Sequence, residues 1–171
     1  MAGIDEAYRV AEIVSNAGGR VVGRTKLQKI GFFLEEAGLG SGFPFRYRHY
    51  GPYSEQLSAA SQHAAALQLI VEKETIANWG GRYSTFHTDL ASNPSTSPIR
   101  IRLIQEMVDS DAVELELAAT AAFLAKEGFS DPWAETARRK PEKAEEGRLE
   151  RAKQLYSRLQ GIETPRSLPA I

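Results

Sequence analysis

Hydrophobic residues recur at helical spacing over two stretches near the start of the chain. The first predicts a helix from Asp5 to Ala17, capped by Asp5 and ended by Gly18-Gly19. A second helix is expected from Thr25 to Ala37, because Thr25 and Gln28 stand at the spacing of a capping box. Gly31 lies on the outer side of this helix, and a glycine there indicates that another segment packs closely against it.

A period-two alternation of side chains follows from Phe43 to Tyr50. It predicts a short half-buried strand, which Gly51-Pro52 breaks. A third helix is expected from Ser54 to Leu67, with Ser54 as its cap. Segments 70–76 and 82–88 are rich in β-branched and aromatic residues and flank turn residues, so they predict a β-hairpin.

The second half of the chain is helical in pattern. Residues 91–98 are rich in Ser, Pro and Asn and predict a linker. Segment 99–108 fits either a strand or a helix, whereas Asp111 begins a well-capped helix. The sequence therefore predicts a helical extension over 99–160 and a disordered tail over 161–171.

The order helix, helix, strand, helix and hairpin predicts the α+β fold class. Residues 1–90 are expected to form a winged-helix-like domain, with the helical C-terminal part packed on it. In such a domain the recognition helix enters the DNA major groove and the hairpin wing touches the DNA backbone. The extra strand between the second and third helices departs from that plan.

Composition narrows the class of protein. The 171 residues are 42% hydrophobic and 25% charged, as in an ordinary globular protein. The absence of cysteine excludes disulfides and thiolate chemistry. No apolar run approaches the ~20 residues of a membrane span, and the N-terminus lacks a signal-peptide pattern. A cytoplasmic protein with no membrane partner is expected.

Charge is unevenly distributed, although the net charge is only −1. The segment 20–49 holds an excess of basic residues, whereas 103–131 is acidic. Cations near the start of the second helix stand where a helix favours anions, and a tryptophan at a hairpin tip marks a partner contact when it is exposed. The candidate residues for binding a protein or a phosphate are Arg24, Lys26, Lys29, Arg46, Arg48, Tyr53 and Trp79. A solvated basic rim, with Trp79 folded back on the helical part, is the alternative.

No catalytic residue, metal site or cofactor is predicted. The three histidines lack metal-ligand spacing. The glycine-rich segment 18–25 resembles a phosphate-binding loop, but it has arginine in place of lysine and follows a helix rather than a strand. We therefore expect no enzyme activity, and a composite carboxylate site formed by folding ranks last among the alternatives.

Two short motifs carry a family resemblance. They are Gly23-Arg24-Thr25-Lys26-Leu27-Gln28-Lys29-Ile30 and Tyr50-Gly51-Pro52-Tyr53-Ser54-Glu55-Gln56-Leu57, with the aromatic-rich segment 43–50 leading into the second. Together they resemble the YwgA-like family of largely uncharacterised prokaryotic proteins. Segments 115–120 and 140–141 resemble the C-terminal half of that family.

Similar motif pairs occur in the toxin-binding C-terminal domain of DarG-type antitoxins and in the Panacea domain of antitoxins and proteolytic adaptors. The resemblance implies a partner-binding module, antitoxin-like or defence-associated. The chain has no macrodomain, so the resemblance does not imply glycohydrolase activity.

The leading hypothesis is a non-catalytic protein–protein interaction module. The third helix contains no lysine or arginine between Ser54 and Leu67, which is unfavourable for DNA recognition. A winged-helix DNA-binding transcriptional regulator is the alternative. Homodimer formation stays open.

Overall fold

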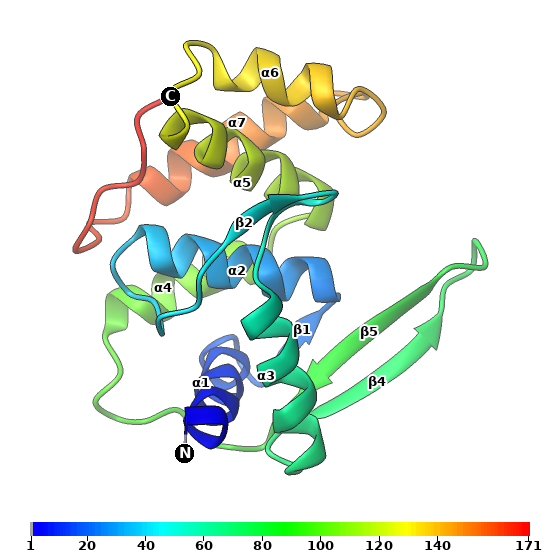
Figure 1. Ribbon diagram of the computed structural model, residues 1–171, viewed down its shortest axis with the longest axis vertical. Helices are drawn as coiled ribbons and strands as arrows, with labels where there is room; N and C mark the ends of the chain where they lie inside the picture. Colours follow the sequence, from blue (N-terminus) through cyan, green and yellow to red (C-terminus); the bar gives the residue numbers. More distant parts are fainter. Residues whose placement is uncertain (1) are drawn as a thin grey trace.

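Helices alternate along the chain with two small antiparallel sheets, which confirms the α+β class (Figure 1). The computed structural model describes residues 2–171. Its elements are α1 (Ala2–Asn16), β1 (Arg20–Val22), α2 (Arg24–Glu36), β2 (Arg46–Arg48), β3 (Gly51–Tyr53), α3 (Glu55–Ala66), β4 (Val71–Ile76), β5 (Arg82–His87), α4 (Pro98–Val108), α5 (Ala112–Lys126), α6 (Pro132–Arg139) and α7 (Arg148–Gln160).

The N-terminal part has the element order of a winged helix, with α1, β1, α2, α3, β4 and β5 following one another along the chain. The strand order is β1-β5-β4, and β1 pairs antiparallel with β5, so that Val21 stands opposite Phe86. Strand β1 has only three residues, too few to show an alternation in the sequence. The hairpin of β4 and β5 is the wing, and the β2–β3 hairpin is an insertion between α2 and α3.

The inserted hairpin corrects the prediction of one strand from Phe43 to Tyr50. Only Arg46–Arg48 is extended there, and Gly51-Pro52 belongs to a second strand that pairs back on it. Gly51 has a φ of +85°, which glycine adopts without steric cost at this turn. Pro52 is tolerated because a two-stranded ribbon consists of edge strands.

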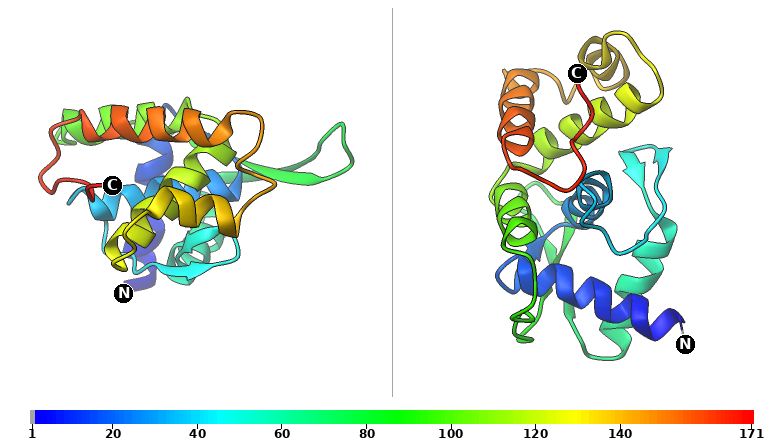
Figure 2. Two further views of the ribbon diagram at one scale, coloured as in Figure 1. Left: turned by 90° about the horizontal axis from the view of Figure 1, so that it is seen from above. Right: turned by 90° about the vertical axis from the view of Figure 1, so that its left-hand side faces the viewer.

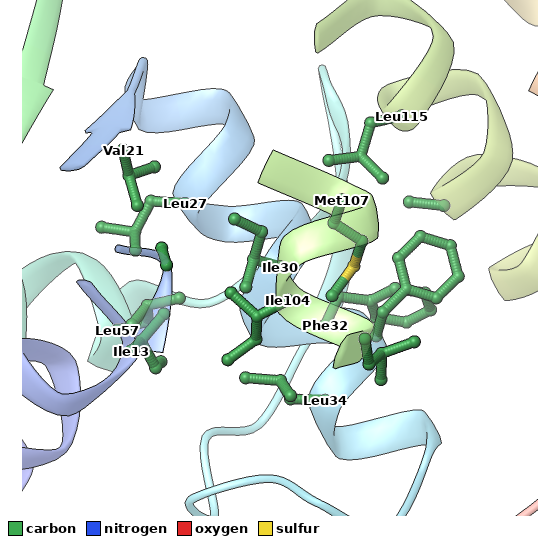
Figure 3. Close-up of a cluster of buried hydrophobic side chains, with 14 of the residues drawn as sticks. Ile13, Val21, Leu27, Ile30, Phe32, Leu34, Leu57, Ile104, Met107 and Leu115 are labelled. Atoms are coloured by element: carbon green, nitrogen blue, oxygen red, sulfur yellow. The ribbon is translucent and has the colours of Figure 1, made fainter. Parts of the chain in front are cut away.

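Helix α2 lies in the centre of the molecule, and every residue from Leu27 to Leu34 is buried. Figure 3 shows Ile30 of this helix beside Ile104 and Met107 of α4. A Cβ at Gly31 would lie 2.7 Å from a methyl carbon of Leu57. The glycine therefore permits α3 to pack closely against α2, as its position in the sequence indicates.

The C-terminal helices share one continuous core with the winged helix. Segment 99–108, ambiguous in sequence, lies within α4, which packs on α1 and α2. Helix α5 packs on α2, and α6 and α7 pack on α5 (Figure 2). Side chains from α1 through α5 and from α7 belong to one hydrophobic cluster, and Trp133 of α6 packs against it.

Helix capping follows the sequence at some ends only. The Ser54 hydroxyl accepts from the Leu57 N–H, and the Asp111 carboxylate caps α5. The capping roles of Asp5 and Thr25 are wrong, because α1 already begins at Ala2 and the N-cap of α2 is Gly23 without a side-chain bond.

The expectation of a disordered tail is corrected. Ile162 and Leu168 are buried in the core. The Arg166 N–H donates to the Ala37 carbonyl at 2.9 Å, and the Tyr156 hydroxyl donates to the carbonyl of Pro169. The two apolar side chains do not recur at the spacing of a helix or a strand, so the sequence pattern does not indicate their burial. Together they anchor the segment over α2 and α7.

Replacing Leu168 by alanine should lower the free energy of unfolding by about 2 kcal/mol, because a buried leucine is truncated. The matched control Ser167→Ala changes an exposed neighbour and should leave stability unchanged. Urea denaturation of both variants measures the difference. Equal stability of the two variants would contradict the packing of this segment.

Candidate partner-binding surface

The wing projects from the body of the molecule (Figures 1 and 2). It carries exposed apolar side chains. Trp79 at its tip is 79% exposed, Ile76 is 68% exposed and Val71 is 62% exposed. The Trp79 ring covers Gly81, where a Cβ would lie 1.5 Å from the ring. Trp79 therefore does not fold back on the helical part, and the wing tip presents a large aromatic surface to solvent.

A pocket of about 200 Å³ lies at the base of the wing. Its walls come from α2, α3, the inserted hairpin and the inner ends of β4 and β5. The polar and aromatic groups that line it include Arg24, Gln28, Tyr50, Tyr53, Gln62 and Glu72. The fold thus brings three of the predicted contact residues, Arg24, Lys29 and Tyr53, to one concave site, although Lys29 is buried in its wall.

Three arginines on this face form ion pairs with glutamates of the same face. Their pairs are Arg24 with Glu72, Arg48 with Glu55 and Arg82 with Glu74. The Arg24–Glu72 pair has an N–O distance of 2.5 Å, and the Ser84 hydroxyl donates a further hydrogen bond to the same carboxylate.

The titration of the first pair follows from these contacts. The hydrogen bond to Glu72 raises the pKa of Arg24. Partial burial would raise the pKa of Glu72, but the bonds from Ser84 and Arg24 hold it below its ordinary value. Both groups are therefore charged at neutral pH, and the positive charge of Arg24 is compensated within the protein.

Lys26 is corrected from a contact residue to a structural one. Its Nζ donates to the carbonyl oxygens of Val108 at 3.0 Å and Ser110 at 2.7 Å. Burial lowers the pKa of Lys26. The side chain thus caps the C-terminal end of α4, where a helix favours a cation.

Lys29 is likewise corrected, because its side chain is only 1% exposed. Its Nζ donates to the Pro52 carbonyl at 2.7 Å. Burial lowers the pKa of Lys29 to about 7, opposed by the charge of Glu116 and assisted by Lys140 and Lys143. The residue joins α2 to the inserted hairpin and is not available to a partner.

Glu116 of α5 is the centre of a buried cluster whose residues are not among those predicted from the sequence. Its carboxylate lies 3.0 Å from the Nζ of Lys140 and 2.7 Å from the Nζ of Lys143. Lys140 also donates to the His49 carbonyl of the inserted hairpin at 3.1 Å. Glu116 and Lys140 both fall in segments that carry the family resemblance, and that was the only signal for them in the sequence.

Arg46 and Tyr53 complete the account of the predicted residues. Arg46 is exposed, and the structure of residues 2–171 gives it no ion pair. Tyr53 is half-buried between the pocket and a shallow groove lined by Arg46 and Arg48. Five predicted residues therefore lie at the surface, although the groove beside Arg46 and Arg48 has no wing residue in its walls. Of the two lysines of α2, Lys29 is buried and Lys26 is half-buried.

Comparison with known proteins adds no relative. Neither a scan against protein-family models nor searches of curated proteins and of solved structures found a match. Within residues 2–171, no group of three or more His, Asp or Glu side chains is placed to hold a metal ion. No helix in that range is long and apolar enough to cross a membrane.

The buried amine of Lys29 gives a prediction for stability against pH. Its pKa is about 7 in the folded protein and 10.5 in an exposed lysine. Between these values the unfolded chain binds more protons, so stability rises with pH, by at most ~1.4 kcal/mol per pH unit for one group. Wild-type protein should therefore gain stability relative to Lys29→Met between pH 7 and 9.

Urea denaturation at several pH values measures this difference. The control Lys73→Met removes an exposed amine of the wing and should follow the wild-type profile. Parallel profiles for wild type and Lys29→Met would show that Lys29 does not titrate abnormally.

Proposed function

We propose that the protein is a non-catalytic protein–protein interaction module that binds its partner with the wing. The observation that carries the proposal is the exposure of Ile76 and Trp79 near the tip of a projecting hairpin, with the exposed Val71 at the other end of β4. Soluble proteins seldom expose such side chains together unless they contact another molecule. Tryptophan is among the residues that contribute most to protein interfaces.

The charges of the winged-helix face support a protein partner over DNA. Helix α3 has no lysine or arginine, and its first turn carries the exposed acid Glu55. Arg24, Arg48 and Arg82 are paired with carboxylates, so a phosphate would have to displace an acid at each of them. Specific DNA binding needs unpaired cations as well as groups that contact the bases.

An adaptor or antitoxin-like role in the cytoplasm is part of this proposal. It rests on the resemblance to the YwgA-like family and to the toxin-binding domain of DarG-type antitoxins. A module of this kind requires a binding surface, and the exposed wing with the pocket at its base supplies one.

The double variant Ile76→Ser with Trp79→Ser should lose partner binding at least tenfold, because it removes the apolar surface of the wing tip. Tagged wild type and variant are purified from the native cells after nuclease digestion, and the stoichiometric protein partner is quantified. The melting temperature should not change, because both side chains are exposed.

The matched control is Tyr8→Ser, which removes a comparably exposed aromatic ring from α1. It should retain full partner binding. Undiminished binding by the double variant would reject the wing as the contact surface.

The DNA-binding alternative has its own test. Titration of a random-sequence duplex at low and moderate salt should give no salt-dependent binding. If the logarithm of the binding constant instead falls with the logarithm of the salt concentration, with a slope of about −0.9 for each phosphate contact, the transcriptional regulator is favoured.

A further inference from the structure

The outer strand of the wing has a free hydrogen-bonding edge. Within residues 2–171 the strand order is β1-β5-β4, so the described part of the chain pairs with β4 on one side only. On β5, the Ser84 carbonyl accepts from Gly23 at 2.7 Å and the Thr88 N–H donates to Gly19 at 3.0 Å, both toward β1. Even-numbered residues of β5 therefore bond toward β1, and odd-numbered residues bond toward β4.

The register then identifies the free groups of β4. Positions 71, 73 and 75 stand opposite odd-numbered residues of β5 and bond to them. Because backbone groups alternate in direction along a strand, the N–H and C=O groups of Glu72, Glu74 and Ile76 point away from β5. These groups form a template for one additional strand.

We propose that the partner adds an extended strand to this edge of β4. The inference rests on the proposed function and specifies the chemistry of the partner. Opposite charges on directly facing residues stabilise strand pairs, whereas like charges destabilise them. Glu72 and Glu74 pair with Arg24 and Arg82 within the protein, so a basic residue of the added strand would share each carboxylate with an arginine. Lys73 is exposed and forms no ion pair within residues 2–171. The edge therefore favours a strand with an acidic residue opposite Lys73, a basic residue on either side of it, and apolar residues opposite Val71 and Ile76. This charge pattern is the same in both directions of the chain.

A second copy of the protein does not fit this edge. When two copies of β4 pair antiparallel about a two-fold axis, even-numbered residues stand opposite even-numbered residues and odd-numbered residues opposite odd-numbered ones. Two registers pair most of the strand, one with its centre at Lys73 and one with its centre at Glu74. In each register the central residue stands opposite the same residue of the second copy. In the register centred on Lys73, Glu72 also faces Glu74. The charges thus disfavour homodimers and leave a different protein as the occupant.

The pocket extends the same binding site. Glu72 lies both on the free edge and in the pocket wall beside Tyr50 and Tyr53. A basic side chain of the added strand, placed opposite Glu72, would share the carboxylate with Arg24 of the same pocket, and it can lie against a tyrosine ring while it does so. The edge and the pocket therefore favour the same residue of the partner.

A synthetic hexapeptide with apolar ends and a lysine–glutamate–lysine centre is the probe. In an amide NMR titration of the full chain, it should shift and protect the backbone N–H groups of Glu72, Glu74 and Ile76. A control peptide with a glutamate–lysine–glutamate centre should bind at least tenfold more weakly. Unchanged amides at these positions, or equal binding of both peptides, would overturn the proposal.

The variant Glu74→Pro removes one outward N–H and should weaken the binding of the peptide at least tenfold. That N–H makes no bond within the sheet, and proline is tolerated at such edge positions. Its control, Glu74→Gln, keeps the N–H and should lower the affinity for the peptide only a few-fold. Should Glu74→Pro not fold, the amide map of the wild-type protein still decides the question.

Failure of this proposal is distinguishable from failure of the proposed function. A peptide that leaves β4 unchanged rejects strand addition, whereas the dependence of partner binding on Trp79 is measured separately.

Discussion

Helix α2 is enclosed by protein, and its long polar side chains must therefore be satisfied inside the core. Gln28 does this by exchanging two hydrogen bonds with the backbone of Ser54, at 2.8 and 3.0 Å. Lys29 donates to the Pro52 carbonyl. An unpaired polar group at this depth would cost about 1–3 kcal/mol. These bonds fix the inserted hairpin and the start of α3 against α2, and thereby position the pocket and the base of the wing.

The same residues favour the proposed protein partner over DNA. The sequence places two lysines near the N-terminus of the central helix, and both donate hydrogen bonds within the protein. Lys26 binds carbonyl groups at the end of α4, and Lys29 binds a carbonyl group of the inserted hairpin. Arg24 is paired with Glu72. Few cations are left for phosphates, and the apolar wing is the most distinctive exposed feature.

Much of the fold follows from local patterns in the sequence. Caps such as Ser54 and Asp111, and the hairpin of the wing, depend on neighbouring residues and were predicted correctly. The burial of Lys29 and the docking of Leu168 depend on groups distant in the chain, so no local pattern indicates them. A surface role assigned from charge alone fails for the same reason, because the sequence does not show which carbonyl a lysine will reach. Trp79 was identified because a turn without apolar neighbours leaves its ring exposed.

Hydrogen exchange on the native complex tests the central claim most directly. The protein is compared alone and with the partner that remains bound after nuclease digestion. Slower exchange of wing amides over 71–87, with little change elsewhere on the surface, is the result that the account predicts. An unchanged wing, with protection confined to other helices, would contradict it.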